Sequence, residues 1–141
     1  MANDTGDFLK SMNIATSGLR AQAGRMRLIS ENIANADSTA LTAGGEPYRR
    51  KIPSFTSALD RSLDAKVVTL GRVRNDATAF RVKNEPGNPA ADAEGNVKYP
   101  NVNPLIEMTD MREAQRSYEA NLNIISATRR MIQRTLDILK A

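Results

Sequence analysis

Residues 103–141 read NPLIEMTDMREAQRSYEANLNIISATRRMIQRTLDILKA, and their pattern indicates a mainly helical protein. Asn103 is a good helix N-cap, and Pro104 suits the first helical position. Acidic residues come early in the stretch and basic residues late, which matches the direction of the helix dipole. Apolar residues recur along it at helical spacing: Met111, Tyr118, Leu122, Ile125, Ile132, Leu136 and Leu139. The pattern predicts one long amphipathic helix over residues 104–141.

A second apolar stripe occupies the other end of the chain. Steps of four and three residues through residues 8–36 pass through apolar side chains at all positions but Gln22, and no proline interrupts them. This spacing predicts a second long helix. Gly18 and Gly24 lie inside the pattern, and each lowers helix stability by about 1 kcal/mol relative to alanine. The first helix therefore needs packing to persist, or its glycines permit the close approach of a neighbour.

The middle of the chain, residues 37–103, holds all but one of the six prolines. Residues 38–50 are loop-like, and Ser54 is expected to cap a short helix that continues to about Leu63. Residues 66–74 and 79–83 are expected to pair as a hairpin about Asn75-Asp76. A long irregular excursion follows, of the kind that is usually functional or ordered by a partner.

The predicted fold is mainly α, with the two terminal helices paired as a coiled coil and a small β-hairpin and irregular middle. Three segments follow from this division: an N-terminal helix over 1–36, an insert over 37–103 and a C-terminal helix over 104–141.

Composition excludes several classes of protein. The chain has 141 residues, of which 40% are hydrophobic and 4% aromatic, so its core is thin and aliphatic. It has no histidine and no cysteine, which removes His general bases, Cys nucleophiles and typical zinc sites. We therefore expect no enzyme, no cofactor and no metal. Residues 1–10 show no cleavable signal, and no apolar run is long enough to span a membrane.

The two stripes pose a packing problem, because the middle is too small and too poor in large apolar residues to cover both. A helix pair would hide part of each stripe and leave an apolar flank in water. This favours assembly with further copies into a bundle or tube, with the ends of a monomer ordering on association. A self-sufficient monomeric helical bundle with a hairpin insert fits the stripes equally well.

Both ends of the chain carry recognisable motifs. Residues 17–39 read SGLRAQAGRMRLISENIANADST, and residues 114–121 read AQRSYEAN, preceded by Glu107-Met108. Together they resemble the terminal signatures of the bacterial flagellar rod and hook family. The middle, with GEPYRRK at residues 45–51 and YPNVN at residues 99–103, is similar to the proximal rod members of that family.

The resemblance implies a structural subunit of the flagellar basal-body rod, the tubular drive shaft that crosses the periplasm and transmits torque. It implies packing of the terminal helices in concentric layers and type III export without a cleaved signal. The implied partners are other copies of itself, other rod subunits, and the adaptor that joins the rod to the export gate and the MS ring.

Candidate residues for helix packing come from the two stripes and from the motifs. Those expected on one side of the seam are Leu19, Met26, Ile29 and Ile33, and those on the other are Tyr118, Leu122, Ile125, Ile132 and Leu136. For any one of them, a place in the core of a single chain is at least as well supported as an intersubunit contact. Asn121 belongs to the same set. Asn32 and Asn35 are interpreted first as a C-terminal helix cap, with hydrogen bonds to a neighbour as the second interpretation.

Two loop stretches are candidates for intersubunit contact: Tyr48, Arg49 and Arg50, and then Pro100, Asn101 and Val102. The basic stretch at residues 48–51 also leaves open a small nucleic-acid-binding helical module, although the net charge of +4 is modest. Asp92 and Glu94 resemble a hydrolase carboxylate pair, but no apolar surroundings are present to raise a pKa, so we reject that role.

Overall fold

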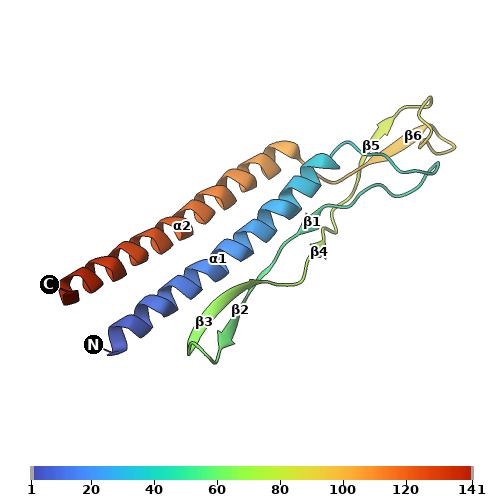
Figure 1. Ribbon diagram of the computed structural model, residues 1–141. Coiled ribbons are helices and arrows are strands. Elements are labelled where there is room, and N and C mark those ends of the chain that lie inside the picture. The colour runs from blue at the N-terminus through green and yellow to red at the C-terminus, as the bar shows by residue number, and fades with distance from the viewer. Residues whose placement is uncertain (1, 141) are drawn as a thin grey trace. The chain divides into compact units, whose positions relative to one another are not determined.

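The computed structural model describes the backbone of residues 2–140 and the side chains of residues 6–140. It has two long helices, one at each end, and a middle that contains short strands (Figure 1). The elements in order are α1 (Ala2–Ala34), β1 (Lys51–Ile52), β2 (Phe55–Asp60), β3 (Ala65–Leu70), β4 (Arg74–Asn75), β5 (Arg81–Asn84), β6 (Asn96–Tyr99) and α2 (Pro104–Lys140). The prediction of two long terminal helices is confirmed. The predicted N-cap is confirmed as well, since the Leu105 amide donates to Asn103 Oδ1 at 3.1 Å.

The strands form three separate antiparallel pairs, β1 with β4, β2 with β3 and β5 with β6. The predicted short helix after Ser54 is wrong, because residues 55–60 form β2. The predicted hairpin is also wrong, because residues 65–70 pair back to β2 and residues 81–84 pair with β6.

The turn between β2 and β3 explains both errors. Asp60 Oδ1 accepts hydrogen bonds from the amide and the hydroxyl of Ser62, and Asp64 closes the turn with a φ of +47°. An aspartate that bonds the backbone two residues on is a strong turn former. Thr56 and Thr69 then face each other across the pair with their hydroxyls 3.0 Å apart. Ser54 does not cap a helix, and its hydroxyl donates to the carbonyl of Arg72.

The chain divides into two compact units. Unit 1 contains Met1–Met26, Ser54–Arg72 and Glu113–Ala141, and unit 2 contains Arg27–Pro53 and Val73–Arg112. Each terminal helix contributes residues to both units. The predicted division into segments 1–36, 37–103 and 104–141 follows the order of the chain and not these units, and it stays a prediction.

In unit 1, α1 and α2 run antiparallel and lie close together. Gly18 faces the side chain of Asn121, and Arg25 pairs with Glu113 at 3.4 Å. The buried positions of the two helices in this unit are small or polar: Ala15, Ala21, Ala114 and Thr128. The hairpin of β2 and β3 lies against α1, where the Val68 amide donates to the Ser17 hydroxyl at 3.2 Å (Figure 1). Small side chains allow this close approach.

Substituting Gly18 tests this close approach. A Cβ at this position would lie 2.8 Å from Asn121 Nδ2 and 3.1 Å from its Cγ, so Gly18→Val is expected to lower the free energy of unfolding by about 1–3 kcal/mol. The matched control is Gly6→Val in the same helix, where an added Cβ meets nothing within 4 Å. That variant is expected to raise stability by up to about 1 kcal/mol, because it removes a helix glycine. Urea unfolding followed by circular dichroism distinguishes the two, and equal effects would contradict the close approach.

Candidate functional site

Asn32 lies in the last turn of α1, and its side chain is the centre of a buried polar cluster in unit 2. Its side chain is 1% exposed and makes four hydrogen bonds. Nδ2 donates to the Lys51 carbonyl at 2.9 Å and to Glu107 Oε2 at 3.0 Å. Oδ1 accepts from the Tyr48 hydroxyl at 2.8 Å and from the Lys51 amide at 3.0 Å. Two donors and two acceptor positions are all that an amide side chain offers, so Asn32 is fully satisfied within the chain.

Glu107, in the first turn of α2, is the buried charge of this cluster. It is 1% exposed, and its second oxygen accepts from Arg50 Nε at 2.6 Å. The same guanidinium lies 3.4 Å from Asp76 and 3.5 Å from Asp110. A buried carboxylate is tolerated when it is both paired and hydrogen-bonded, and this one is. We refer to Asn32, Tyr48, Arg50, Asp76, Asn101 and Glu107 as the polar cluster.

The remaining members of the polar cluster come from the segments between the two helices. Asn101 Oδ1 accepts from the Arg50 amide at 2.8 Å, and its Nδ2 donates to the carbonyls of Asp76 and Thr78. Burial, together with the nearby charges of Glu31 and Glu107, raises the pKa of Tyr48 to about 12. The amide of Thr78 and the guanidinium of Arg50 lower the pKa of the Asp76 carboxyl. Tyr48 is therefore a neutral donor and Asp76 an anion at neutral pH.

The basic stretch at residues 48–51 is neutralised inside the chain. Arg50 pairs with Glu107, Lys51 pairs with Glu31, and Arg49 lies 4.2 Å above the ring of Phe80. Pro100 and Val102 are buried in the same unit. These side chains thus serve unit 2 itself, and the intersubunit role of the loop candidates stays a prediction.

Asn35 lies beyond the end of α1 and closes its last turn. Its backbone amide and its Nδ2 both donate to the Glu31 carbonyl, at 3.1 and 2.8 Å. The predicted cap is therefore present at Asn35, with a negative φ, since Asp64 is the one non-glycine residue with positive φ among those described. Asn32 does not act as a cap.

The predicted helix seam is only partly inside the chain. Ile29 is buried. The half-buried members are Leu19, Met26, Ile33, Tyr118, Asn121, Ile125 and Ile132, whereas Leu122 and Leu136 are exposed. The assembly role of all these residues stays a prediction. Sequence reasoning did not predict the burial of Ala21, Ala114 and Glu107; it considered Glu107 as an acidic residue near a helix start and as part of the C-terminal motif.

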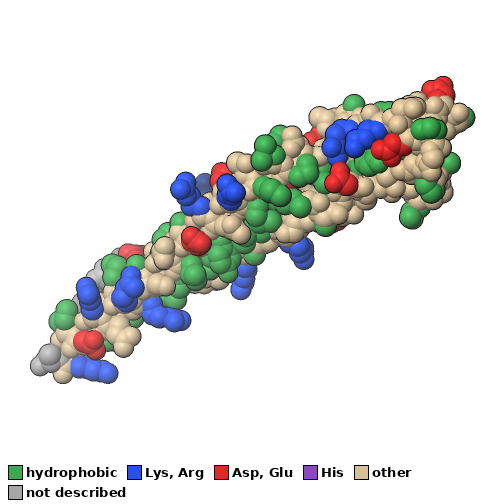
Figure 2. All heavy atoms as spheres, turned by 90° about the horizontal axis from the view of Figure 1, so that it is seen from above, with side chains coloured by type: hydrophobic (Ala, Val, Ile, Leu, Met, Phe, Trp, Pro, Cys, Tyr) green, Lys and Arg blue, Asp and Glu red, His purple; other side chains and the backbone are tan. Residues whose placement is uncertain are grey.

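Helix α2 carries many large apolar side chains that stay exposed along its length. Ile138 and Leu139 are 76% and 65% exposed. The exposed apolar residues of α2 are Leu105, Ile106, Met108, Leu122, Ile124, Met131, Leu136, Ile138 and Leu139. In Figure 2, exposed hydrophobic side chains alternate with Lys and Arg side chains. So many large apolar side chains left in water on one helix favour contact with a partner.

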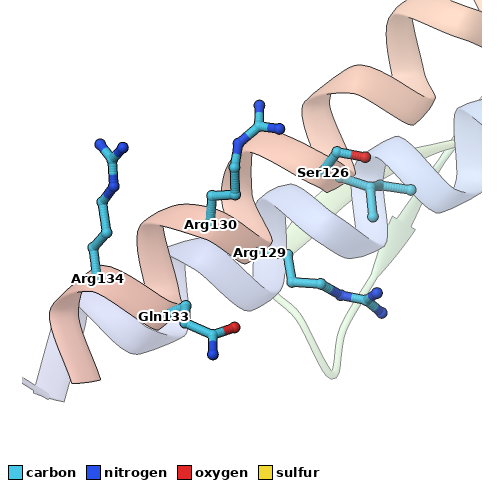
Figure 3. A pocket seen from close by; sticks show the side chains of 6 residues that line it. Ser126, Arg129, Arg130, Gln133 and Arg134 are labelled. Carbon is cyan, nitrogen blue, oxygen red and sulfur yellow. The ribbon is translucent and has the colours of Figure 1, made fainter. Parts of the chain in front are cut away.

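A shallow, open hollow lies along the second half of α2, lined by Ile125, Ser126, Arg129, Arg130, Gln133 and Arg134. Arg130 and Arg134 project from one side of the helix, and Arg129 and Gln133 lie on another (Figure 3). Within residues 6–140, no group of three acidic side chains is placed to hold a metal. Neither helix, over its described length, is apolar enough to cross a membrane.

Comparison with known proteins matches both ends of the chain. The family model described as "Flagella basal body rod protein" matches residues 12–40. The model described as "Flagellar basal body rod FlgEFG protein C-terminal" matches residues 93–138.

Proteins named "Flagellar basal-body rod protein FlgC" are similar over nearly the whole chain. The one from Agrobacterium fabrum is 53% identical, with 91% of this chain and 92% of the relative covered. Those from Bacillus subtilis and Salmonella typhimurium are 39% and 36% identical, over 92% and 93% of this chain and 97% of each relative.

Proposed function

Since the chain belongs to the FlgC family of flagellar basal-body rod proteins, we propose that it is a structural subunit of the bacterial flagellar rod. The family relation carries the proposal, because it extends over both terminal motifs and the middle. The relatives are named as rod proteins, which supports a structural role and gives no support to an enzyme. Nor does anything in these relations support the nucleic-acid-binding alternative.

The helices are the proposed means of assembly. Most helical stability in proteins comes from packing an apolar face, and α2 keeps large apolar side chains exposed to its last turn. Neighbouring subunits would bury Leu122, Leu136, Ile138 and Leu139. Ile29 and the small residues Ala21 and Ala114 would pack within the chain instead.

Coiled-coil pairing of α1 and α2 is the finer part of the proposal. It is supported by the opposed positions Gly18 and Asn121 in unit 1 and by the antiparallel run of the helices there. Several such pairs side by side would form a tube able to transmit torque and serve cell motility.

The proposed neighbours are other copies of this chain and other rod subunits. The adaptor to the export gate and MS ring, and the type III export apparatus in transit, follow from the resemblance of the terminal motifs. The same resemblance supports a place in the periplasmic part of the basal body and export without a cleaved signal.

Isolation of basal bodies tests the proposal. In a strain whose own gene for this chain is deleted, we expect non-motile cells without complete rods. Motility should return with the intact gene, and the chain should co-purify with basal bodies. Full motility of the deletion strain, or absence of the chain from purified basal bodies, would refute the role in the rod.

A further inference from the structure

The polar cluster in unit 2 contains the buried polar contact between the ends of the two helices. Among the residues described, the buried polar side chains are Asn32, Glu107 and Thr128, and the first two touch each other. Asn32 Nδ2 lies 3.0 Å from Glu107 Oε2, so α1 and α2 meet here through a directional hydrogen bond.

We propose that the hydrogen bond between Asn32 and Glu107 fixes the axial register of α1 against α2 in unit 2. The chain would thereby select a single arrangement of its helices before any neighbour is present, which is a property separate from its role as a rod subunit.

The apolar residues of unit 2 are poor at fixing this register by themselves. On α1 they are Leu28 and Ile29, which are buried, and Ile33, which is half-buried, and all three are aliphatic. On α2 the half-buried residue one turn after Glu107 is Met111, whose flexible side chain adapts to many surroundings. Aliphatic and thioether side chains of this kind pack about as well after a shift of one turn.

The polar pair does not tolerate such a shift. A slide that carries Glu107 toward Leu28 would press a carboxylate against a buried aliphatic side chain and separate it from Asn32. A slide the other way would carry Glu107 past Ala34, where α1 ends. An uncompensated buried charge lowers the population of the shifted arrangement by more than about 100-fold. A single buried polar residue sets register in coiled coils by the same physics.

Asn32 is further held from the other side. Its Oδ1 accepts from the Tyr48 hydroxyl and the Lys51 amide, and its Nδ2 also donates to the Lys51 carbonyl. These bonds leave the amide group one orientation, with Nδ2 directed at Glu107. Glu107 is held in turn by Arg50. If α1 shifted along α2, neither Asn32 nor Glu107 could move with the other and keep their hydrogen bond.

Distance measurement between spin labels tests the proposal. The chain has no cysteine, so labels attach specifically to Ala34→Cys and Arg112→Cys, which replace exposed residues of unit 2. The unaltered polar cluster should give one narrow distance. The double variant Asn32→Leu with Glu107→Leu should remain helical and give a second population, displaced by several ångströms, since one helical turn is about 5.4 Å.

Two further variants keep the test decisive. Glu113→Leu, at an exposed ion pair on the same helix, should keep the single distance. Asn32→Leu alone leaves Glu107 paired with Arg50 and should still give a minor shifted population. A single unchanged distance in folded Asn32→Leu and in the folded double variant Asn32→Leu with Glu107→Leu would overturn the proposal. If neither Asn32→Leu nor the double variant folds, the proposal is overturned as well, because the pair of Asn32 and Glu107 would then be required for folding itself.

Discussion

Replacing Glu107 with alanine is expected to lower the free energy of unfolding by about 3 kcal/mol. Loss of one partner from a buried ion pair costs roughly 3–5 kcal/mol. The lower end applies here because Arg50 retains Asp76 at 3.4 Å and Asp110 at 3.5 Å. Asn32 also loses a hydrogen-bond acceptor at 3.0 Å. Urea unfolding of the purified chain, followed by far-ultraviolet circular dichroism, measures the loss.

Glu113→Ala is the matched control for this prediction. It makes the same substitution on the same helix, but the Glu113 side chain is 66% exposed and its pair with Arg25 spans 3.4 Å. Exposed ion pairs contribute less than about 1 kcal/mol. The two variants should therefore differ by at least about 2 kcal/mol, and an equal loss would show that burial of Glu107 does not matter.

Ile138→Asp is expected to abolish rod assembly without destabilising the free chain. The Ile138 side chain is 76% exposed, so the carboxylate meets water in the monomer, where surface substitutions usually change stability by no more than about 0.5 kcal/mol. If neighbours bury this position, each subunit adds an uncompensated buried charge that costs about 3–5 kcal/mol. Cells carrying the variant should lose soft-agar motility.

Gln133→Asp provides the comparison for that result. It adds the same charge to the same exposed half of α2, beside Arg129, Arg130 and Arg134 rather than on an apolar side chain. Cells with this variant should swim. Normal motility with Ile138→Asp, or equal loss with both variants, would exclude burial of Ile138 in the rod.

The helices followed from the sequence because their signals are local. Asn103, Pro104 and the ordering of charges mark the start and direction of α2 within a few residues, and the structure follows them. The turn at Asp60 and Ser62 was equally local, but the apolar spacing of Phe55, Leu59 and Leu63 suggested a helix. Strand pairing then overrode that spacing.

The polar cluster could not be predicted, because its members come from distant parts of the chain. Asn32 and Glu107 are 75 residues apart, and Arg50 reaches Glu107 across 57. No local pattern indicates which acid will be buried, so Glu107 resembled any acidic residue in a first helical turn. The stripes similarly indicated which side chains are apolar but not how many a second helix would cover. For that reason the sequence placed Leu122 and Leu136 in the seam, whereas the structure leaves both side chains exposed.

Thiol labelling measures whether the apolar end of α2 is buried in the assembled rod. Because the chain has no cysteine, Ile138→Cys introduces its single thiol. Basal bodies are purified from a motile strain that carries this variant. Maleimide should label the variant chain in these basal bodies at least about 10-fold more slowly than it labels the same chain when free and folded. Equal labelling rates in the two states would contradict the claim that neighbouring subunits cover this face.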